Sequence, residues 1–216
     1  MKSYKISLRE KELNSIRNNS SAVKLIFSVC SHIANLSIAD LYFDIPTNPL
    51  PYVILYISDS MNRLIWENEN RQLHSIHFPF FVSDNGSFLK LHYHGIEIDS
   101  QAIQALTRLF ISEDLQVSFA GLFEEFLETA KEFDLSSLRQ QEIWVLYQYL
   151  CSFEIGYLRY DYDPEHEDGQ RHPLHHLDIN FSNACTYKIG LTSNMEVDTF
   201  VDLLNLETDC KYISLN

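Results

Sequence analysis

The chain has 216 residues, of which 45% are hydrophobic, and its formal net charge at pH 7 is −14. This length suffices for one sizeable core, and the low glycine and proline counts argue against long low-complexity linkers. The negative charge disfavours a bare nucleic-acid-binding protein, because basic side chains that neutralise phosphates supply much of the affinity of such proteins. The longest apolar runs are too short to cross a membrane, and no apolar run follows the basic first residues, so we expect a cytoplasmic protein without a signal peptide.

The acidic side chains are concentrated in one part of the chain. Residues 1–112 contain ten acidic and ten basic side chains, whereas residues 113–168 contain fourteen acidic and three basic ones, a net charge of −11. A surface of this kind favours solubility, cations or a basic protein partner. A simple solvated face is the common alternative.

The first half of the chain changes from helical to strand-like patterns. Apolar spacing predicts helices over Ser7–Asn18 and Ala22–Leu36, and three prolines indicate an irregular connector over Leu41–Leu50. Alternation of apolar and polar residues then predicts an antiparallel meander with strands at Tyr52–Ser58, Leu64–Glu67, His74–Val82 and Phe88–Ile98.

A histidine patch follows from the last predicted hairpin of this meander. Asp84-Asn85-Gly86 is typical of a tight turn, and a two-residue turn at Asn85-Gly86 places His77 opposite His94. His92 then lies on the same face. The patch suits a metal ion or a stacked neutral pair, and ordinary polar residues on a solvated face are the alternative.

Residues 99–150 have mostly helical patterns. Helices are predicted over Ser100–Phe110, Ser118–Phe133 and Leu138–Leu150, and four glutamates of the second helix point outward: Glu124, Glu125, Glu128 and Glu132. The tryptophan and tyrosine content of the third helix leaves a strand interpretation open.

Tyr157–Ile179 is the stretch that most resembles a chemical site. Leu158, Tyr160 and Tyr162 alternate with acidic and basic residues, Pro164 ends the first strand, and a second alternation follows His172-Pro173. If the two strands pair, one side of the hairpin carries Asp161, Asp163, His176 and Asp178.

These four side chains are plausible ligands for a divalent metal ion, and His172 or His175 is then a candidate general base. The spacing matches no established metal signature, and carboxylates beside histidines on a half-exposed sheet also form ordinary ion pairs. Both interpretations stay open at this point.

The hairpin also resembles a motif of an uncharacterised bacterial family. The segment His172-Pro173-Leu174-His175-His176-Leu177-Asp178-Ile179-Asn180 is similar to a His-Pro-x-x-His-x-His-Ile-Asn strand that precedes a C-terminal helix in that family. Asp178 stands where the family has the second histidine of its His-x-His pair. The resemblance covers about the last third of the chain, and it implies a genomic context near defence or mobile-element genes and no particular activity.

The last elements complete the predicted fold. A short strand at Thr186–Leu191 and a helix that begins near Glu196 follow the hairpin. We expect a single α+β domain with a largely antiparallel sheet and helices mainly on one face. Its parts are N-terminal helices and a connector (1–50), the meander (51–98), helices with an acidic face (99–150), and the His/Asp-rich hairpin with the C-terminal helix (151–216).

Two functions compete on this evidence. The first is a non-catalytic protein-interaction component of a bacterial defence-type or mobile-element system, which binds a protein partner through its acidic surface. The second is a small metal-dependent hydrolase, possibly a nuclease, that uses Asp161, Asp163, His176 and Asp178. No Gly-rich phosphate loop or dinucleotide motif is present, so no organic cofactor is expected, and a divalent metal is expected only for the hydrolase.

Overall fold

A computed structural model describes residues 1–14, 16, 18–35, 51–111, 119–180 and 187–212. The protein has the α+β class that the sequence predicts, and the strand pairs among these residues are antiparallel. Its internal contacts gather in two compact units. The sheet unit comprises Met1–Asn18, Asp44–Phe78 and Ile155–Asn216, and the helical unit comprises Asn19–Phe43 and Pro79–Glu154.

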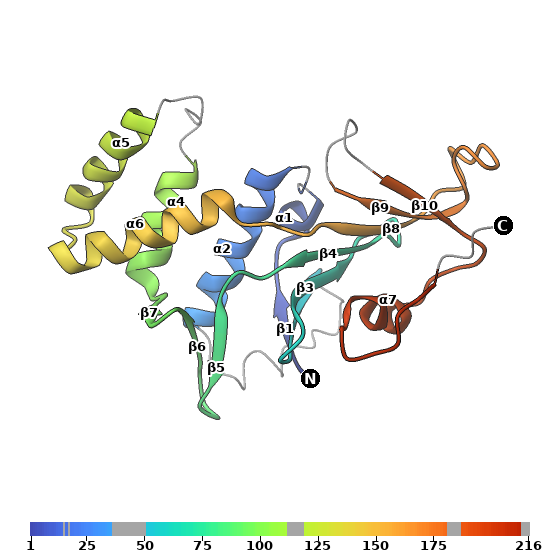
Figure 1. The fold of residues 1–216 in the computed structure, drawn as a ribbon, viewed down its shortest axis with the longest axis horizontal. Coiled ribbons are helices and arrows are strands. Elements are labelled where there is room, and N and C mark those ends of the chain that lie inside the picture. Colours follow the sequence, from blue (N-terminus) through green and yellow to red (C-terminus); the bar gives the residue numbers. More distant parts are fainter. Residues whose placement is uncertain (15, 17, 36–50, 112–118, 181–186, 213–216) are drawn as a thin grey trace. The chain divides into compact units, whose positions relative to one another are not determined.

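The sheet unit is built on a seven-stranded sheet with the order β1-β2-β3-β4-β8-β9-β10 (Figure 1). Its strands are β1 (Lys2–Ser7), β2 (Tyr52–Ile57), β3 (Asn62–Glu67), β4 (Leu73–His77), β8 (Leu158–Tyr162), β9 (His175–Ile179) and β10 (Tyr187–Leu191). The helices α1 (Glu10–Asn14) and α7 (Val197–Leu204) belong to the same unit. Because β8 pairs with β4, the β8–β9 hairpin joins the sheet that the earlier strands form.

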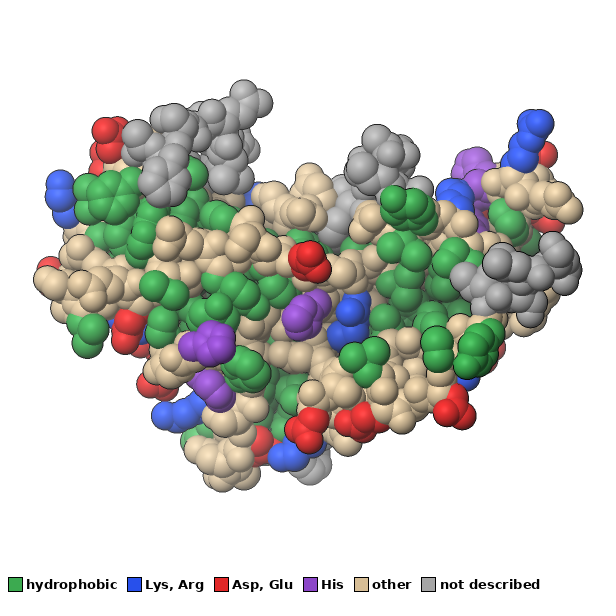
Figure 2. Space-filling view, viewed as in Figure 1, with side chains coloured by type: hydrophobic (Ala, Val, Ile, Leu, Met, Phe, Trp, Pro, Cys, Tyr) green, Lys and Arg blue, Asp and Glu red, His purple; other side chains and the backbone are tan. Residues whose placement is uncertain are grey.

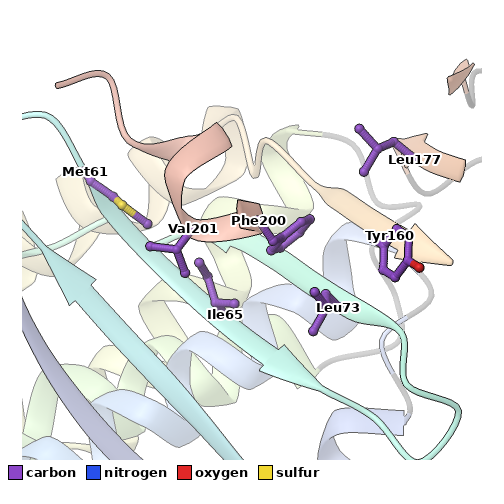
Figure 3. Close-up of a cluster of buried hydrophobic side chains, with 7 residues drawn as sticks. All are labelled: Met61, Ile65, Leu73, Tyr160, Leu177, Phe200 and Val201. Atoms are coloured by element: carbon purple, nitrogen blue, oxygen red, sulfur yellow. The ribbon is translucent and has the colours of Figure 1, made fainter. Parts of the chain in front are cut away.

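Helix α7 covers one face of this sheet (Figure 3). Its Phe200 and Val201 pack with Ile65 of β3, Leu73 of β4 and Tyr160 of β8 in one buried cluster. Burial of a phenylalanine contributes roughly 1.5–3 kcal/mol, so Phe200, which has no exposed surface, anchors the helix. Successive residues of a strand point to opposite faces, so the neighbours of these core residues lie on the other face of the sheet.

The helical unit contains four described helices and a three-stranded sheet with the order β5-β6-β7. The elements are α2 (Asn19–Asn35), β5 (Phe81–Asp84), β6 (Leu89–Tyr93), β7 (Ile96–Glu97), α4 (Ser100–Ile111), α5 (Phe119–Glu132) and α6 (Ser137–Ser152). Aromatic rings link three of the helices, since Phe110 of α4 lies 5.7 Å from Phe27 of α2 and 5.2 Å from Tyr147 of α6, measured between ring centroids. The three helices predicted within residues 99–150 are confirmed, and the open strand interpretation of α6 is wrong.

The N-terminal segment differs from its prediction. Lys2–Ser7 is a strand paired with β2, and the helix predicted over Ser7–Asn18 is reduced to Glu10–Asn14. Burial of Tyr4 and Ile6 between more exposed neighbours shows the period of two that identifies a strand. The second predicted helix is confirmed as α2, and the connector predicted over Leu41–Leu50 lies outside the described residues.

The predicted meander over residues 51–98 is divided between two sheets. The single strand predicted over His74–Val82 is wrong, because β4 ends at His77 and β5 begins at Phe81. Pro79 lies in the gap and cannot donate a hydrogen bond to a sheet ladder. Strands β2, β3 and β4 therefore belong to the sheet unit, whereas β5, β6 and β7 belong to the helical unit.

The register of the β5–β6 hairpin also differs from its prediction. Phe81 pairs with His92 and Asp84 with Leu89, so four residues form the turn instead of two. The Asn85 side chain stabilises this longer turn, because its Oδ1 accepts hydrogen bonds from the backbone N–H groups of Ser87 and Phe88.

The shifted register removes the predicted histidine pair. His77 pairs with Arg63 of β3, and the predicted pairing of His77 with His94 is wrong. The ring of His92 instead stacks on Phe81, with the centroids 5.8 Å apart. Within the described ranges, no helix is both long enough and apolar enough to cross a membrane.

Candidate metal centre

Three of the four predicted ligands meet on the face of the β8–β9 hairpin that α7 does not cover. Asp161 lies directly opposite His176, and Asp178 lies two residues farther along β9 on the same face. One potential ligand atom from each residue lies within 4.8 Å of the other two. The side chains of Asp161, His176 and Asp178 are 4%, 0% and 7% exposed, so their donor atoms are withdrawn from water. We call these three residues the Asp-His-Asp cluster.

Arg159 connects the two carboxylates of the cluster. It lies opposite Asp178, and its Nη2 atom is 2.6 Å from Asp161 Oδ2 and 2.6 Å from Asp178 Oδ2. Arg159 was not among the predicted site residues, although its alternation with Asp161 is a signal that it shares the same face. One guanidinium and two carboxylates leave one formal negative charge when His176 is neutral.

The orientation of His176 is fixed by the backbone. Its Nδ1 lies 2.8 Å from the carbonyl oxygen of Pro173, which only accepts hydrogen bonds, so Nδ1–H is the donor. In the neutral ring Nε2 then carries a lone pair, and it lies 3.4 Å from Asp161 Oδ2 and 4.0 Å from Asp178 Oδ1.

Gly190 helps to place that carbonyl group. It lies opposite His176 on β10, and a Cβ atom at this position would be 2.9 Å from Cγ of Pro173. The missing side chain therefore makes room for the Pro173 ring, which carries the hydrogen-bond acceptor for His176.

Each residue of the cluster also has one potential metal-ligand atom that forms no hydrogen bond among the described residues. Asp161 Oδ1, His176 Nε2 and Asp178 Oδ1 are buried and have no hydrogen-bond partner within the described part of the chain. A buried polar atom left unsatisfied costs about 1–3 kcal/mol. Burial raises the pKa of Asp161; Arg159 opposes this shift, and Asp178 adds to it. The cluster therefore has the electrostatic character of a site that takes up a cation or a proton.

Asp163 and His172 lie beside the cluster rather than in it. Strand β8 ends at Tyr162, and Asp163 accepts hydrogen bonds from the Nδ1 and backbone N atoms of His166, at 2.9 and 3.2 Å. Although burial opposes the shift, these hydrogen bonds lower the pKa of Asp163. The His172 ring lies 4.7 Å from that of His176, and its Nε2 is 3.9 Å from Asp163 Oδ2.

His175 lies on the opposite face of the hairpin. Its Nδ1 is 2.8 Å from the hydroxyl oxygen of Tyr160, which itself donates to Asn194 Oδ1 at 2.7 Å. Its ring also stacks on Tyr162, with the centroids 5.3 Å apart. The structure thus separates this candidate general base from the cluster, whereas it places His172 next to it.

The polar face continues from the cluster into the earlier strands. His74 lies opposite Arg159 and stacks on Trp66, with the rings 5.0 Å apart and 7° from parallel. The Nδ1 atom of His74 is 3.2 Å from the hydroxyl of Tyr157, and burial raises the pKa of that hydroxyl to about 12. His77 belongs to the face that α7 covers, so it does not contribute to this row.

A pocket of about 210 Å³ reaches the same face near His74. Its other lining residues are Leu13, Asn14, Ile16, Asn68, Glu69, Asn70 and Gln72. No member of the Asp-His-Asp cluster is among the residues that line it. The pocket therefore gives no direct access to the cluster.

Comparisons with protein-family models, with curated proteins and with solved structures find no match to the chain. The resemblance of the His172–Asn180 segment to an uncharacterised bacterial family stays a prediction. The geometry of the Asp-His-Asp cluster is the basis for the function proposed below.

Proposed function

We propose that the protein binds one divalent transition-metal ion at the Asp-His-Asp cluster and that the ion stabilises the β8–β9 hairpin. The observation that carries this proposal is the convergence of Asp161, His176 and Asp178, since one potential ligand atom of each lies within 4.8 Å of the other two. Each of the three residues also has a buried atom without a hydrogen-bond partner among the described residues, and an ion bound here offers such atoms a partner.

The orientation of His176 supports the same function. In metal sites, a ligating histidine usually donates its other ring N–H to a backbone carbonyl or a carboxylate, which fixes the tautomer and the ring orientation. His176 Nδ1 has this contact with the carbonyl oxygen of Pro173, and Nε2 remains for the ion. One imidazole with two carboxylates suits zinc, manganese, cobalt or iron in their divalent states.

Burial of the cluster favours a structural ion over a catalytic one. A hydrolase needs a coordination position that substrate and water can reach. The three ligand side chains are at most 7% exposed, and the pocket near His74 does not include them. The metal-dependent hydrolase stays an alternative, in which His172 is the general base that lies nearest to the cluster.

The test is a metal titration of the full chain after treatment with a chelator. We expect one equivalent of zinc or cobalt to bind and to raise the melting temperature. His176→Ala and Asp178→Asn should bind at least about 10-fold more weakly, since even loss of an outer-sphere partner costs 10–100-fold.

His175→Ala is the matched control, because it removes the neighbouring imidazole from the opposite face of the same strand. It should keep one equivalent of metal. Absence of binding by the folded wild-type chain, or unchanged binding by folded His176→Ala and Asp178→Asn, would contradict the proposal.

The structure also offers an observation that favours the protein-interaction function. Large apolar side chains are exposed on α5 and α6: Phe123 is 43% exposed, Leu127 38%, Leu138 67% and Val145 45%. Figure 2 shows hydrophobic side chains gathered over these two helices. Helix α5 also carries three exposed glutamates, Glu124, Glu128 and Glu132. Apolar and acidic groups together suit a partner segment with apolar and basic residues.

Charge reversal tests this second function. A partner of the α5–α6 surface should be retained by the immobilised wild-type chain and lost by the Glu124→Lys/Glu128→Lys variant. The partner should still bind a Glu165→Lys/Glu167→Lys control variant, in which exposed carboxylates elsewhere in the acidic segment are changed. Equal retention by both variants would show that α5 does not hold the partner.

A further inference from the structure

His172 is the last residue before Pro173 in the connection between β8 and β9. Its ring packs edge-on against His176, with a centroid distance of 4.7 Å and an angle of 71° between the ring planes. The side chain is 24% exposed, but its Nδ1 atom is buried and has no hydrogen-bond partner in the described ranges. His172 thus adds a fourth unsatisfied donor atom beside the three of the Asp-His-Asp cluster.

We propose that His172 is the fourth protein ligand of the bound ion, so that four side chains close the site and exclude a coordinated water. This inference rests on the proposed function, because it concerns the same ion. It assigns to His172 a different role from that of a general base, which would act on a water held by the ion.

The distances allow this coordination with a small rearrangement. Two ligand atoms bound tetrahedrally to zinc, each at about 2.0 Å, lie about 3.3 Å apart. The three cluster atoms now lie within 4.8 Å of one another, and the two imidazole rings are in contact. Binding therefore requires the distances between ligand atoms to shorten by up to about 1.5 Å and the His172 ring to turn Nδ1 toward the ion.

The surroundings of His172 resemble those of His176 in part. In each histidine, one ring nitrogen is buried and forms no hydrogen bond within the described residues, and the other nitrogen faces an oxygen atom. His176 Nδ1 donates to the carbonyl oxygen of Pro173 at 2.8 Å, whereas His172 Nε2 lies 3.9 Å from Asp163 Oδ2, beyond hydrogen-bond distance. His166 holds that carboxylate in place through two hydrogen bonds. A carboxylate behind a ligating histidine is a common outer-sphere arrangement in metal sites.

The formal charges agree with a divalent ion in this larger site. Asp161, Asp163 and Asp178 contribute three negative charges, and Arg159 contributes one positive charge. With neutral histidines, the sum is −2, which one divalent cation neutralises. A buried site with balanced charges avoids the large desolvation cost of an unpaired charge.

Cobalt spectroscopy of the full chain tests the inference. We expect wild-type protein and the His175→Ala control to bind cobalt with intense visible bands typical of four-coordination, and added thiocyanate should leave these bands unchanged. His172→Ala should bind cobalt about 10-fold or more weakly, because it loses a direct ligand. Thiocyanate should change its spectrum, since the open position accepts the anion. His172→Gln repeats the test with a longer polar side chain, in case the alanine variant is poorly folded.

The outcomes separate the two proposals. If folded wild-type protein binds no cobalt, both the proposed function and the role of His172 are wrong. If wild-type protein binds one equivalent but His172→Ala binds equally well, the metal site stands and the ligand role of His172 is overturned. A wild-type spectrum that responds to thiocyanate would also overturn the closed site.

Discussion

At the scale of single residues, Arg159 decides the electrostatics of the hairpin when no metal is bound. Its Nη2 contacts one oxygen of each carboxylate, and the other oxygen of each forms no hydrogen bond with the residues that the structure describes. Two carboxylates this close would repel each other strongly without the guanidinium. Arg159 is therefore a built-in counter-ion that neutralises half of the local negative charge.

Removal of Arg159 should be costly in metal-free protein. Arg159→Met leaves two buried carboxylates unpaired, and breaking a buried ion pair costs about 3–5 kcal/mol of unfolding free energy. Urea unfolding in the presence of a chelator measures this cost, which should shrink when saturating zinc replaces the lost positive charge. Arg108→Met is the control, since Arg108 is 44% exposed in its pair with Glu125 and should cost less than about 1 kcal/mol. Equal costs for the two variants would show that the buried pair has no special importance.

The raised pKa of Asp161 gives a pH dependence with a defined sign. Burial makes the folded chain bind a proton at Asp161 more tightly than the unfolded chain does. The resulting stability is fully present below the unfolded pKa of about 3.9, and it is lost as the pH rises through the folded pKa.

Metal-free wild-type protein should therefore lose stability relative to Asp161→Asn, which cannot titrate, as the pH rises from about 4 toward neutrality. Urea unfolding of both proteins in chelator across this range gives the difference in unfolding free energy. If the difference in unfolding free energy stays constant, or if the wild type becomes relatively more stable as the pH rises, burial does not raise the pKa of Asp161.

The members of the site were predictable from sequence to different degrees. Asp161, His176 and Asp178 share a face because strand alternation and hairpin pairing are local rules, and these rules held. Alternation also predicts Asp163 on this face, but β8 ends one residue earlier, at Tyr162. The Asp163 carboxylate instead accepts a hydrogen bond from His166 in the connection between β8 and β9. The orientation of connecting residues depends on contacts that alternation does not describe.

At the scale of elements, the hairpin depends on its neighbour β10. Gly190 of β10 provides the space for Pro173, and the Pro173 carbonyl orients His176. The contact joins an edge strand of the sheet to the connection between β8 and β9. Packing in this small region therefore affects the geometry of the metal ligands.

Gly190→Ala should destabilise the protein by about 1–3 kcal/mol, because the new methyl group overlaps the rigid Pro173 ring. Displacement of the Pro173 carbonyl should also weaken metal binding about 10-fold, as loss of other outer-sphere partners does. Thermal unfolding and metal titration give the two values. Tyr187→Ala changes an exposed residue of the same strand and should keep the wild-type affinity. An unaltered metal affinity in Gly190→Ala would show that the contact between Gly190 and Pro173 does not influence metal binding.

Elements that rest on local patterns were predicted well, and those that depend on distant pairing were not. Apolar stripes identified α2, α4, α5 and α6, because their spacing is contained within each helix. Strand β1 is not predicted from the alternation at Tyr4 and Ile6 alone, because its partner β2 is about fifty residues away. The β5–β6 register failed because Asn85 supports a four-residue turn in place of the two-residue turn that Asn-Gly favours.

At the scale of the whole molecule, the chain alternates between the two compact units. The helical unit is formed by residues that interrupt the sheet unit twice, at Asn19–Phe43 and at Pro79–Glu154. No local pattern in the sequence shows this division, because it follows from contacts between distant segments. The candidate metal centre belongs entirely to the sheet unit.

Metal binding should protect the backbone of the sheet unit selectively. A ligand stabilises only those openings that break its site. Amide hydrogen exchange should therefore slow in β8 and β9 when zinc is added, whereas exchange in α5 and α6 of the helical unit should not change. Mass spectrometry of the exchanged peptides measures both regions at once. Equal slowing in α5 and α6 would show that the two units open together.

Anomalous scattering from crystals grown with zinc or cobalt measures most directly whether an ion binds at the Asp-His-Asp cluster. We expect one strong peak about 2.0–2.2 Å from donor atoms of Asp161, His176 and Asp178, with His172 Nδ1 as the fourth ligand. A peak bound by the first three residues and a water would keep the metal site and remove His172 from it. A well-ordered cluster without a peak, with Arg159 still bridging both carboxylates, would show that these residues form a buried ion-pair network rather than a metal site.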